Sequence, residues 1–490
     1  MAWIFGDSFD CYVAFADMAL GYWDSAAGLG TSLVAGRFAG GQAVQFNNAA
    51  APSMIKTSAV NDAVHHISIA FRQTAPLTGS TLAGYFQLSD GATNQCCIVF
   101  RTDGVILLTS ATPGGTVLAT YAGAVTAPST WFQFEFEVII HNTTGSFKAR
   151  KNGSTTDDFS ATGLNTRPGA NAYANKLSMG QNTAINATHI DDLLWRSDAA
   201  SVPWVGDVRC YTRMPVSDAS VQFARSPVTI TQPANAAGSS AANIIGTARY
   251  ASFVPTNSGT IGTVTQPFAV AFTGNMKCSI FASSGSGPTT VLGSATPVAL
   301  SSALLATFTF STPVSVVKGT QYWIGFAPDA ASGQMTATGA SAGLASTTTY
   351  ANFPLASPTT ANDRAPTASS VISTTVNADS VSETLQDGTT SYVYDAVAGH
   401  ADFYNVAPLT PAPASVVAVT TRGFVVKGDA GTRTGAVQLK SGGTTVAAPT
   451  VALSTSFGWS WRTDTTNPAG GAAWTAAAVD AAQIGPLVVS

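Results

Sequence analysis

Alternation of apolar and polar residues dominates the chain. Residues 132–138 (FQFEFEV) change character at every position, as a strand with one buried and one solvent-facing side requires. Turn-forming residues follow at 141–145 (HNTTG), and an Asn-Gly pair at 152–153 separates the next two alternating segments. Because Asn-Gly favours tight hairpin turns, these segments predict an antiparallel meander.

Further strand candidates recur about every ten residues, the spacing typical of β-sandwiches. They lie at residues 65–71, 82–88, 98–108, 190–195 and 205–211. Long runs at helical spacing are almost absent, so we expect an all-β protein. The regular spacing predicts a two-sheet sandwich of the jelly-roll or lectin kind over residues 1–215. Its first strand, at residues 5–10, is expected to pair with residues 208–211.

At 490 residues the chain exceeds what one hydrophobic core supports, so several domains are expected. From about residue 226 the sequence becomes rich in Thr, Ser, Ala and Pro, and residues 226–372 predict a smaller β-sandwich, for which a carbohydrate-binding type is one candidate. Residues 216–225 together with 373–490 predict a C-terminal β-rich module. The strand candidates in these parts are residues 276–282, 306–310, 322–326, 391–394, 416–420, 424–427 and 436–439, and one short helical turn is expected at 476–480.

The chain contains few charged residues, and their distribution excludes nucleic acid as a partner. Charged residues make up 10% of the chain, against about 25% in typical soluble proteins. The net charge is −4, and no run of Lys or Arg offers the basic surface that nucleic acid requires. The chain begins without a signal-peptide pattern and has no apolar stretch of ~18 residues, so we expect a soluble protein that is made in a cytoplasm.

The five cysteines form no metal-binding or disulfide framework that the spacing would reveal. Buried free thiols are therefore expected. Cys11 and Cys210 are an alternative, because the first and last strands of a jelly roll commonly pair, and a bond between them would need Cα atoms within ~7 Å.

Three segments resemble a family of tailed-bacteriophage virion proteins that begin with a concanavalin A-like, laminin-G-like domain. They are residues 5–12 (FGDSFDCY) with 36–38 (GRF) behind them, residues 147–153 (FKARKNG), and residues 190–195 (IDDLLW) leading to 206–209 (GDVR). Together they span nearly all of residues 1–215. Residues 389–393 through 473–475 look like the tail-proximal module of that family. The block at about 226–372 departs from the family pattern and reads as an insertion.

The resemblance implies a non-enzymatic structural protein of the phage tail tip, collar or fibre, assembled in the host cytoplasm and located in the virion. Its expected partners are other virion proteins, further copies of itself, commonly as a trimer, and host-surface glycan. Two alternatives remain open: a capsid decoration or head-fibre protein, and a tail-associated polysaccharide depolymerase.

Two sets of residues match patterns found in enzymes, and each also has a structural interpretation. Residues 5–8 (FGDS) match the Gly-Asp-Ser block of certain esterases, but the required Asn and Asp/His pair occur only fused and too early, at residues 61–65. A strand start whose Asp and Ser cap turns is the favoured interpretation. The pairs Glu135/Glu137 and Asp157/Asp158 are carboxyl pairs of the kind a glycosidase uses. Glu135 and Glu137, about 7 Å apart on one strand face, satisfy its ~5–10 Å carboxyl spacing, but a solvated face explains such pairs more simply.

Aromatic residues are the usual stacking surface for sugars. The glycan-stacking candidates are Trp204, Tyr322, Trp323, Trp459 and Trp461, each with a core or subunit-interface position as its alternative. Trp459 and Trp461 alternate, so both rings face the same side of a strand and form either a core wall or a platform.

No cofactor is expected, and the histidines show no ligand spacing. Calcium is the one metal considered, with Asp191, Asp192 and Asp207 as its candidate ligands, because hard cations collect several oxygen atoms.

Overall fold

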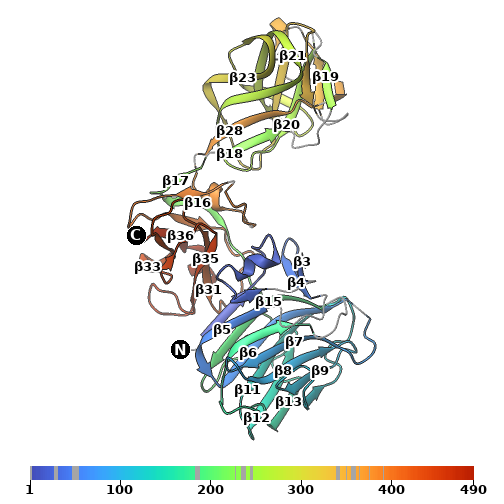
Figure 1. Cartoon of the computed structure of the whole chain (residues 1–490), viewed down its shortest axis with the longest axis vertical. Helices are drawn as coiled ribbons and strands as arrows, with labels where there is room; N and C mark the ends of the chain where they lie inside the picture. Colours follow the sequence, from blue (N-terminus) through green and yellow to red (C-terminus); the bar gives the residue numbers. More distant parts are fainter. Residues whose placement is uncertain are drawn as a thin grey trace. The chain divides into compact units, whose positions relative to one another are not determined.

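The computed structural model divides into two compact units that are both built from β-strands (Figure 1). Unit one comprises residues 1–214, 384–386 and 396–490, and unit two comprises residues 215–383 and 387–395. The residues described are 3–26, 31–46, 54–74, 76–181, 188–226, 228–232, 239–242, 247–337, 343–348, 350–354, 360–363, 365–374, 376–383, 385–389 and 391–490. Within these ranges no helix is long and apolar enough to span a membrane.

Residues 3–198 form a jelly-roll sandwich of two antiparallel sheets, which confirms the predicted fold class. The first sheet has the order β13-β12-β11-β6-β15-β4-β3, with β1 beside β15, and the second has the order β10-β9-β8-β7-β14-β5-β2. The first contains β1 (Trp3–Asp7), β3 (Thr31–Ala35), β4 (Gln42–Phe46), β6 (Val64–Gln73), β11 (Trp131–Ile139), β12 (Gly145–Lys151), β13 (Phe159–Leu164) and β15 (Thr188–Asp198). The second contains β2 (Ser25–Ala26), β5 (Met54–Asp62), β7 (Leu82–Ser89), β8 (Asn94–Arg101), β9 (Ile106–Ser110), β10 (Val117–Tyr121) and β14 (Ala174–Gly180).

The core of the sandwich lies between the two sheets and is rich in phenylalanine. Phe100 of β8 stacks on Phe71 of β6 with ring centroids 4.1 Å apart, and its ring lies 6.2 Å from that of Phe134 in β11. All three side chains are buried. The alternation of residues 132–138 therefore does place one row of aromatic side chains in the core, as predicted.

The predicted pairing of the first strand was wrong. Residues Trp3–Asp7 of β1 pair with Leu193–Ser197 of β15, whereas residues 208–211 form no strand. The predicted strand at 205–211 is instead an extended segment whose polar groups are bonded to side chains of the jelly roll. We call residues 203–213 the exit segment, because the chain leaves the sandwich through it.

The C-terminal part of unit one is also β-structure. Its strands are β30 (Phe403–Val406), β31 (Val419–Val425), β32 (Thr434–Ser441), β33 (Thr444–Ala447), β34 (Val451–Ala452), β35 (Gly458–Asp464) and β36 (Gln483–Val488). The strands β30, β36, β32 and β33 are adjacent in one sheet, β34 pairs with β32, and β31 pairs with β35. The predicted helical turn is α1 (Ala476–Asp480), whose start is capped by the Thr475 hydroxyl.

The β31–β35 pair packs directly on the jelly roll. The buried Asp7 carboxylate accepts a hydrogen bond from Arg422 at 3.3 Å. The indole N–H groups of Trp459 and Trp461 donate to the carbonyl oxygens of Asp17 and Gly21, both at 3.0 Å. The two tryptophans therefore form a wall of the jelly-roll core, which is one of the two alternatives predicted for them.

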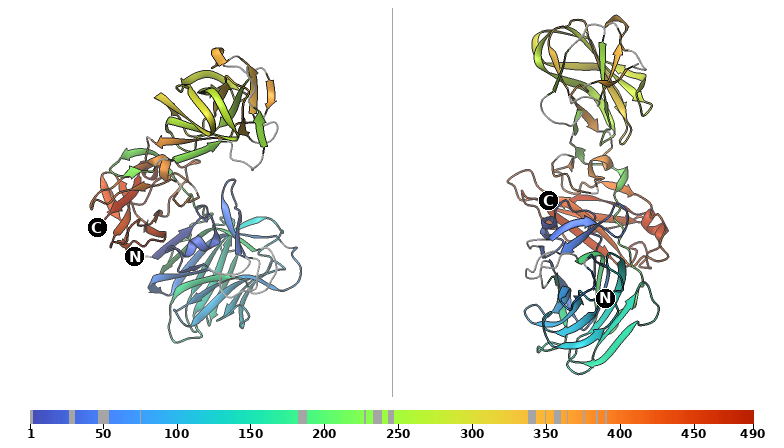
Figure 2. Two further views of the ribbon diagram at one scale, coloured as in Figure 1. Left: turned by 45° about the horizontal axis from the view of Figure 1, so that its top comes forward. Right: turned by 90° about the vertical axis from the view of Figure 1, so that its right-hand side faces the viewer.

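Unit two is organised around β21 (Gly259–Ser283), a 25-residue strand. It pairs along its length with β23 (Val298–Val316), β24 (Tyr322–Pro328) and β28 (Ala368–Thr374). The strands predicted at 276–282, 306–310 and 322–326 lie within β21, β23 and β24. The remaining strands are β16 (Pro215–Ser220), β17 (Ala224–Arg225), β18 (Val228–Gln232), β19 (Ser239–Ala242), β20 (Thr247–Phe253), β22 (Pro288–Ser294), β25 (Gln334–Ala337), β26 (Gly343–Thr347), β27 (Thr360–Asp363) and β29 (Val393–Tyr394). Figure 2 shows both units from two further sides.

Candidate functional site

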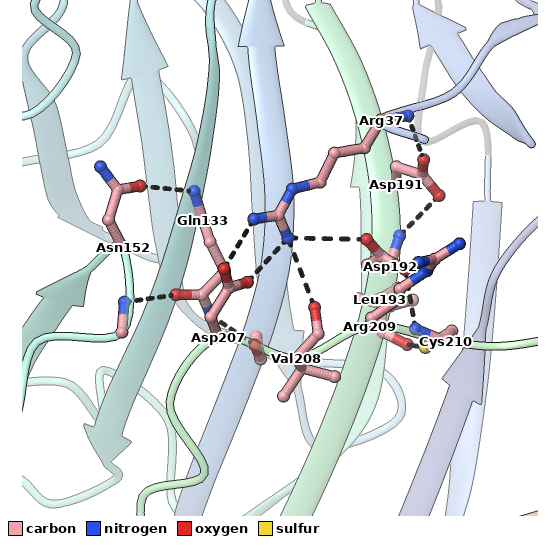
Figure 3. A network of polar contacts seen from close by, with 12 residues as sticks. Arg37, Gln133, Asn152, Asp191, Asp192, Leu193, Asp207, Val208, Arg209 and Cys210 are labelled. Atoms are coloured by element: carbon pink, nitrogen blue, oxygen red, sulfur yellow. Dashed lines mark hydrogen bonds and ion pairs between the residues drawn. The ribbon is translucent and has the colours of Figure 1, made fainter. Parts of the chain in front are cut away.

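A network of charged side chains joins β15 to the turn between β3 and β4 and to the exit segment (Figure 3). Arg37 binds Asp207 through both ends of its guanidinium, with Nη1–Oδ1 at 2.7 Å and Nη2–Oδ2 at 2.8 Å. Its Nη1 also lies 3.7 Å from Oδ2 of Asp192, and its backbone N–H donates to Asp191 at 2.7 Å. We call Asp10, Arg37, Asp191, Asp192 and Asp207 the aspartate cluster.

A bulge in β15 sets the direction of the two adjacent aspartates. The register of β15 against β6 shifts between Asp191 and Leu194, and Asp192 has a φ of 50°, a conformation that Asp tolerates better than most residues. The Asp192 carboxylate thereby accepts the backbone N–H of Cys210 at 2.7 Å. Gly36 is also required, since a Cβ there would lie 2.7 Å from the Asp191 carboxylate.

The Asn-Gly turn at 152–153 is linked to the same exit segment through Gln133. Asn152 and Gly153 have φ values of 52° and 74°, as a tight hairpin turn requires. The Gln133 backbone N–H donates to the Asn152 side chain at 3.0 Å, and the Gln133 side-chain amide donates to the Gly206 carbonyl at 3.0 Å. Figure 3 shows that parts of all three segments behind the phage resemblance meet here.

Burial changes the protonation of the aspartate cluster. Removal from water raises the pKa of Asp191 to about 6 and that of Asp192 to about 8. Repulsion by Asp10 adds to the rise at Asp191, and repulsion by Asp191 adds to the rise at Asp192. Burial also raises the pKa of Asp10, whose carboxylate accepts the Gln42 backbone N–H at 2.8 Å. Near neutral pH the cluster therefore holds both protonated and ionised carboxyl groups.

A pocket of about 240 Å³ opens beside this cluster. Asp10, Asp191 and Asp192 line it together with Arg209 and Arg213, the turn at residues 38–41, the backbone and side chains of 210–212, and Thr410. The lining thus combines three carboxyl groups with two guanidinium groups.

Aromatic rings at this pocket are already covered by arginine. The Arg209 guanidinium carbon lies 3.8 Å from the ring centroid of Phe38 and 4.2 Å from that of Tyr211, and the corresponding distance from Arg213 to Tyr211 is 5.1 Å. These are cation–π distances. Polar groups rather than free ring faces are therefore what the pocket offers.

The three calcium candidates converge around an arginine. The Arg37 guanidinium contacts both Asp192 and Asp207, so it occupies the place that a cation bound by both carboxylates would need. Among the residues described, no group of three or more His, Cys, Asp or Glu side chains could hold a metal ion.

A second cluster lies on the outer face of the first sheet, and we call it the glutamate cluster: His66, Glu135, Glu137, Lys148 and Arg196. Glu135 is 1% exposed and accepts hydrogen bonds from Arg196 at 3.1 Å and from two backbone N–H groups of the exit segment. Glu137 contacts His66 and Lys148, both at 2.9 Å, and the hydrogen bond from His66 lowers its pKa to about 2. The predicted solvated face was therefore wrong, because the exit segment covers it.

The two other carboxylate candidates, Asp157 and Asp158, are exposed and bonded locally. Asp157 contacts Arg150 at 2.9 Å, and Asp158 accepts the Lys151 backbone N–H at 2.8 Å.

The structure does not bring the five glycan-stacking candidates together. Trp204 is half-buried, with its ring 4.7 Å from that of His66 and 4.2 Å from the Arg150 guanidinium. Tyr322 and Trp323, 7% and 5% exposed, lie in cores of unit two. Trp459 and Trp461 pack against the jelly roll as described above.

The esterase-like residues have structural contacts. Asp7 accepts hydrogen bonds from the Phe9 backbone, the Tyr12 hydroxyl and the Trp23 indole at 2.7–3.0 Å. The Ser8 hydroxyl lies 2.6 Å from that of Thr212. Cys11 and Cys210 are both free thiols, so the alternative of a disulfide between them is not what the structure shows.

Sequence reasoning did not identify four further charged and aromatic residues of the pocket lining: Asp10, Arg209, Tyr211 and Arg213. A signal was present, since Arg209, Tyr211 and Arg213 alternate with other residues and extended backbone places such residues on one side. Sequence alone does not show which ring each arginine covers.

Similarity to known proteins is found among solved structures. No protein-family profile matches the chain, and no curated protein sequence matches it. Among solved structures, arcelin-5, a lectin-like defence protein from Phaseolus vulgaris, is 9% identical and covers 40% of this chain and 99% of its own, with a TM-score of 0.25. The exoplasmic/lumenal domain of VIP36, in its Ca²⁺/Man3GlcNAc-bound form, is 9% identical and covers 35% of this chain and 83% of its own, with a TM-score of 0.25.

A third solved structure, the CBM22-1–CBM22-2 tandem domain of Paenibacillus barcinonensis Xyn10C, is 11% identical. It covers 76% of this chain and 97% of its own, with a TM-score of 0.21. The description of residues 3–198 as a jelly roll rests on the strand order given above.

Proposed function

We propose that this protein is a non-enzymatic structural component of a tailed-bacteriophage particle, at the tail tip, collar or fibre, that attaches to host-surface glycan. In this proposal it assembles as a homo-oligomer with other virion proteins as neighbours. One observation carries it: parts of all three segments that resemble phage virion proteins meet in the network of Arg37, Asp207 and Asn152. Residues that meet in this way form one structural unit, which supports the resemblance.

The carboxylates of the glutamate cluster favour a structural role over hydrolysis. A glycosidase needs two carboxyl groups that face a bound sugar from either side. Glu135 is bonded to Arg196 and to the exit segment, and Glu137 is held between His66 and Lys148. Both groups are thus engaged by the chain itself.

The location in the particle can be measured directly. Purified particles of the phage that encodes this chain would be imaged by cryo-electron microscopy, and the two-sheet sandwich would be fitted into the density. We expect it at the tail. Density on the capsid would favour a decoration or head-fibre protein, and absence from the particle would refute the proposal.

A second measurement separates attachment from cleavage. The purified chain is incubated with host polysaccharide, and both binding and the release of reducing ends are followed. We expect binding without release. Release that disappears in Glu135→Gln would instead support a depolymerase.

A further inference from the structure

We propose that the strand β23 of unit two pairs edge to edge with β23 of a second copy of this chain, antiparallel and around a two-fold axis. This inference rests on the homo-oligomer of the proposed function and assigns its contact to one strand. The backbone groups of β23, its composition and its exposed leucines support the pairing.

One edge of β23 has no partner strand over part of its length. Among the residues described, β23 pairs only with β21, and residues 305–309 do so in continuous register. The Thr309 carbonyl accepts the Thr296 backbone N–H at 3.2 Å, so it points away from β21. Since the backbone groups of successive residues alternate between the two edges of a strand, those of Leu305 and Thr307 point to this open edge as well.

A proline on the neighbouring strand agrees with this direction. Pro267 of β21 lies opposite Leu305 and has no N–H to donate. If the backbone groups of Leu305 faced β21, its carbonyl would lack the donor that a hydrogen-bonded pair requires. With these groups turned to the open edge, the pair loses no hydrogen bond.

This edge lacks the features that usually protect an edge strand, which are short length and charged side chains. The strands at the ends of the two jelly-roll sheets, β2, β3, β10 and β13, have 2, 5, 5 and 6 residues. In contrast, β23 has 19 residues, and residues 278–317 contain no charged side chain. An uncharged edge meets an identical edge without the repulsion between like charges, which favours a second copy as the partner.

Two leucines at this edge are exposed. Leu304 and Leu305 are 61% and 55% exposed. Alternation places Leu304 in the same row as Ala306 and Phe308, which are buried. The core-facing row of β23 thus continues to a residue that the chain itself does not cover, and a strand added beside β23 would cover it.

A two-fold axis at Ala306 brings complementary residues together. It places Leu305 opposite Thr307 of the second copy, and the same pair recurs on the other side of the axis. The two pairs exchange four backbone hydrogen bonds. In this register Leu304 lies opposite Phe308 of the second copy, so the two core-facing rows join.

The paired stretch is short, so the dimer is weak. Ser302 has a φ of 52°, and Pro313 follows on the other side, which limits regular pairing to the residues between them. A contact of this length buries less than the ~1,200 Å² of a stable interface. We therefore expect a dissociation constant on the order of 1–100 μM.

Two substitutions block the open edge. Leu305→Lys adds a charge there, and Val254→Lys is its matched control, at a position of the same unit that is 49% exposed and outside any strand. Thr307→Pro removes one N–H from the edge. Sedimentation velocity on the full chain, from about 1 to 300 μM, should show a dimer for the unmodified chain and for Val254→Lys. Both edge variants should weaken the dimer at least about tenfold, with thermal unfolding as the check of their fold.

Cysteine cross-linking tests the register. In the variant Leu305→Cys/Thr307→Cys, each new thiol lies opposite the other one in the second copy, at the ~5.5 Å Cα separation that a disulfide accepts. Thr309→Cys/Ser311→Cys is the matched control, because both positions are exposed on the same strand but neither lies opposite a new cysteine. Under mild oxidation, we expect linked dimers from the first variant only.

The outcomes separate this inference from the proposed function. A monomer at every concentration would overturn the pairing, while density for the chain in the phage tail would still support the structural role. A dimer that persists in Leu305→Lys and Thr307→Pro would overturn the assignment to β23. A trimer, or equal cross-linking of the control variant, would overturn the two-fold register but leave the homo-oligomer standing.

Discussion

The two carboxylate clusters of the jelly roll differ in how their charge is balanced. In the glutamate cluster, Glu135 and Glu137 are matched by Arg196, His66 and Lys148. In the aspartate cluster, several carboxyl groups share one guanidinium, that of Arg37, whose shortest side-chain contacts go to Asp207. The first cluster is covered by the exit segment, and the second lines a pocket. The glutamate cluster therefore has a matched cation for each carboxylate, whereas the carboxyl groups of the aspartate cluster share Arg37 among themselves.

The two clusters also respond to pH in opposite directions. The pKa of Glu137 is lowered to about 2, so the stability it contributes is present above its unfolded value of ~4.3 and is lost as the pH falls through about 2. The pKa values of Asp191 and Asp192 are raised. Their contribution is fully present below ~3.9, the unfolded value, and is lost as the pH rises through about 6 and 8.

The largest expected effect on stability follows from removing the Arg196 guanidinium from the glutamate cluster. Arg196→Met leaves the buried Glu135 carboxylate without its guanidinium partner. Breaking a buried ion pair from one side costs about 3–5 kcal/mol, so the free energy of unfolding should fall by that amount in urea denaturation followed by tryptophan fluorescence.

A double substitution distinguishes the lost charge pair from lost packing. Glu135→Gln combined with Arg196→Met removes both charges, and most of the stability should return. A cost below about 1 kcal/mol for Arg196→Met alone would show that the glutamate cluster is not balanced in the way described.

The strands that carry the glutamate cluster could be predicted from the sequence. The position of the exit segment over that cluster could not. Residues 132–138 alternate strictly, and β11 has the expected apolar inner row at Phe132, Phe134 and Phe136. The same pattern suggested that Glu135 and Glu137 face water. Alternation separates the two sides of a strand, but it does not show that residues 203–206, some 70 positions later, lie over one of them.

The aspartate cluster shows a similar limit. The Asp191-Asp192 pair was identified as a candidate, but as a calcium ligand set rather than as partners of Arg37. Strict alternation would place adjacent residues on opposite sides of a strand, and only the bulge at Asp192 lets both carboxylates serve one network. Residues 188–195 contain no Gly or Asn, the residues that most often mark such a bulge, and the two aspartates alone do not predict it.

The next largest effect on stability is expected at the aspartate cluster, and it depends on pH. Asn resembles protonated Asp and tolerates positive φ, so Asp192→Asn should leave stability unchanged near pH 3, below the unfolded pKa of ~3.9. At pH 9 it removes a buried charge, and the variant should be more stable than the unmodified chain by on the order of 2 kcal/mol. Thermal unfolding at both pH values measures this. A variant that loses stability at pH 9 would mean that Asp192 is ionised and well paired in the folded protein.

A smaller effect is expected at Trp204, which lies between the glutamate cluster and Arg150. Trp204→Ala removes a half-buried ring and its cation–π contact with Arg150, at a cost of about 1–2 kcal/mol. Because the ring packs against His66 and Arg150 of the chain itself, binding of host polysaccharide should be unchanged. Loss of polysaccharide binding with an intact fold would support the stacking role that the sequence suggested for Trp204.

The smallest effect tests whether Asp207 competes with Asp192 for Arg37. The side chain of Asp207 is 48% exposed, so Asp207→Asn should cost less than about 1 kcal/mol at pH 6. The substitution removes one negative charge and frees the Arg37 guanidinium, which lies 3.7 Å from Asp192, to pair with that carboxylate. Both changes favour ionised Asp192 and lower its pKa. The loss of stability between pH 6 and pH 9 should therefore become shallower in a series of thermal unfolding curves, and a steeper loss would show that Arg37 does not serve the two aspartates in common.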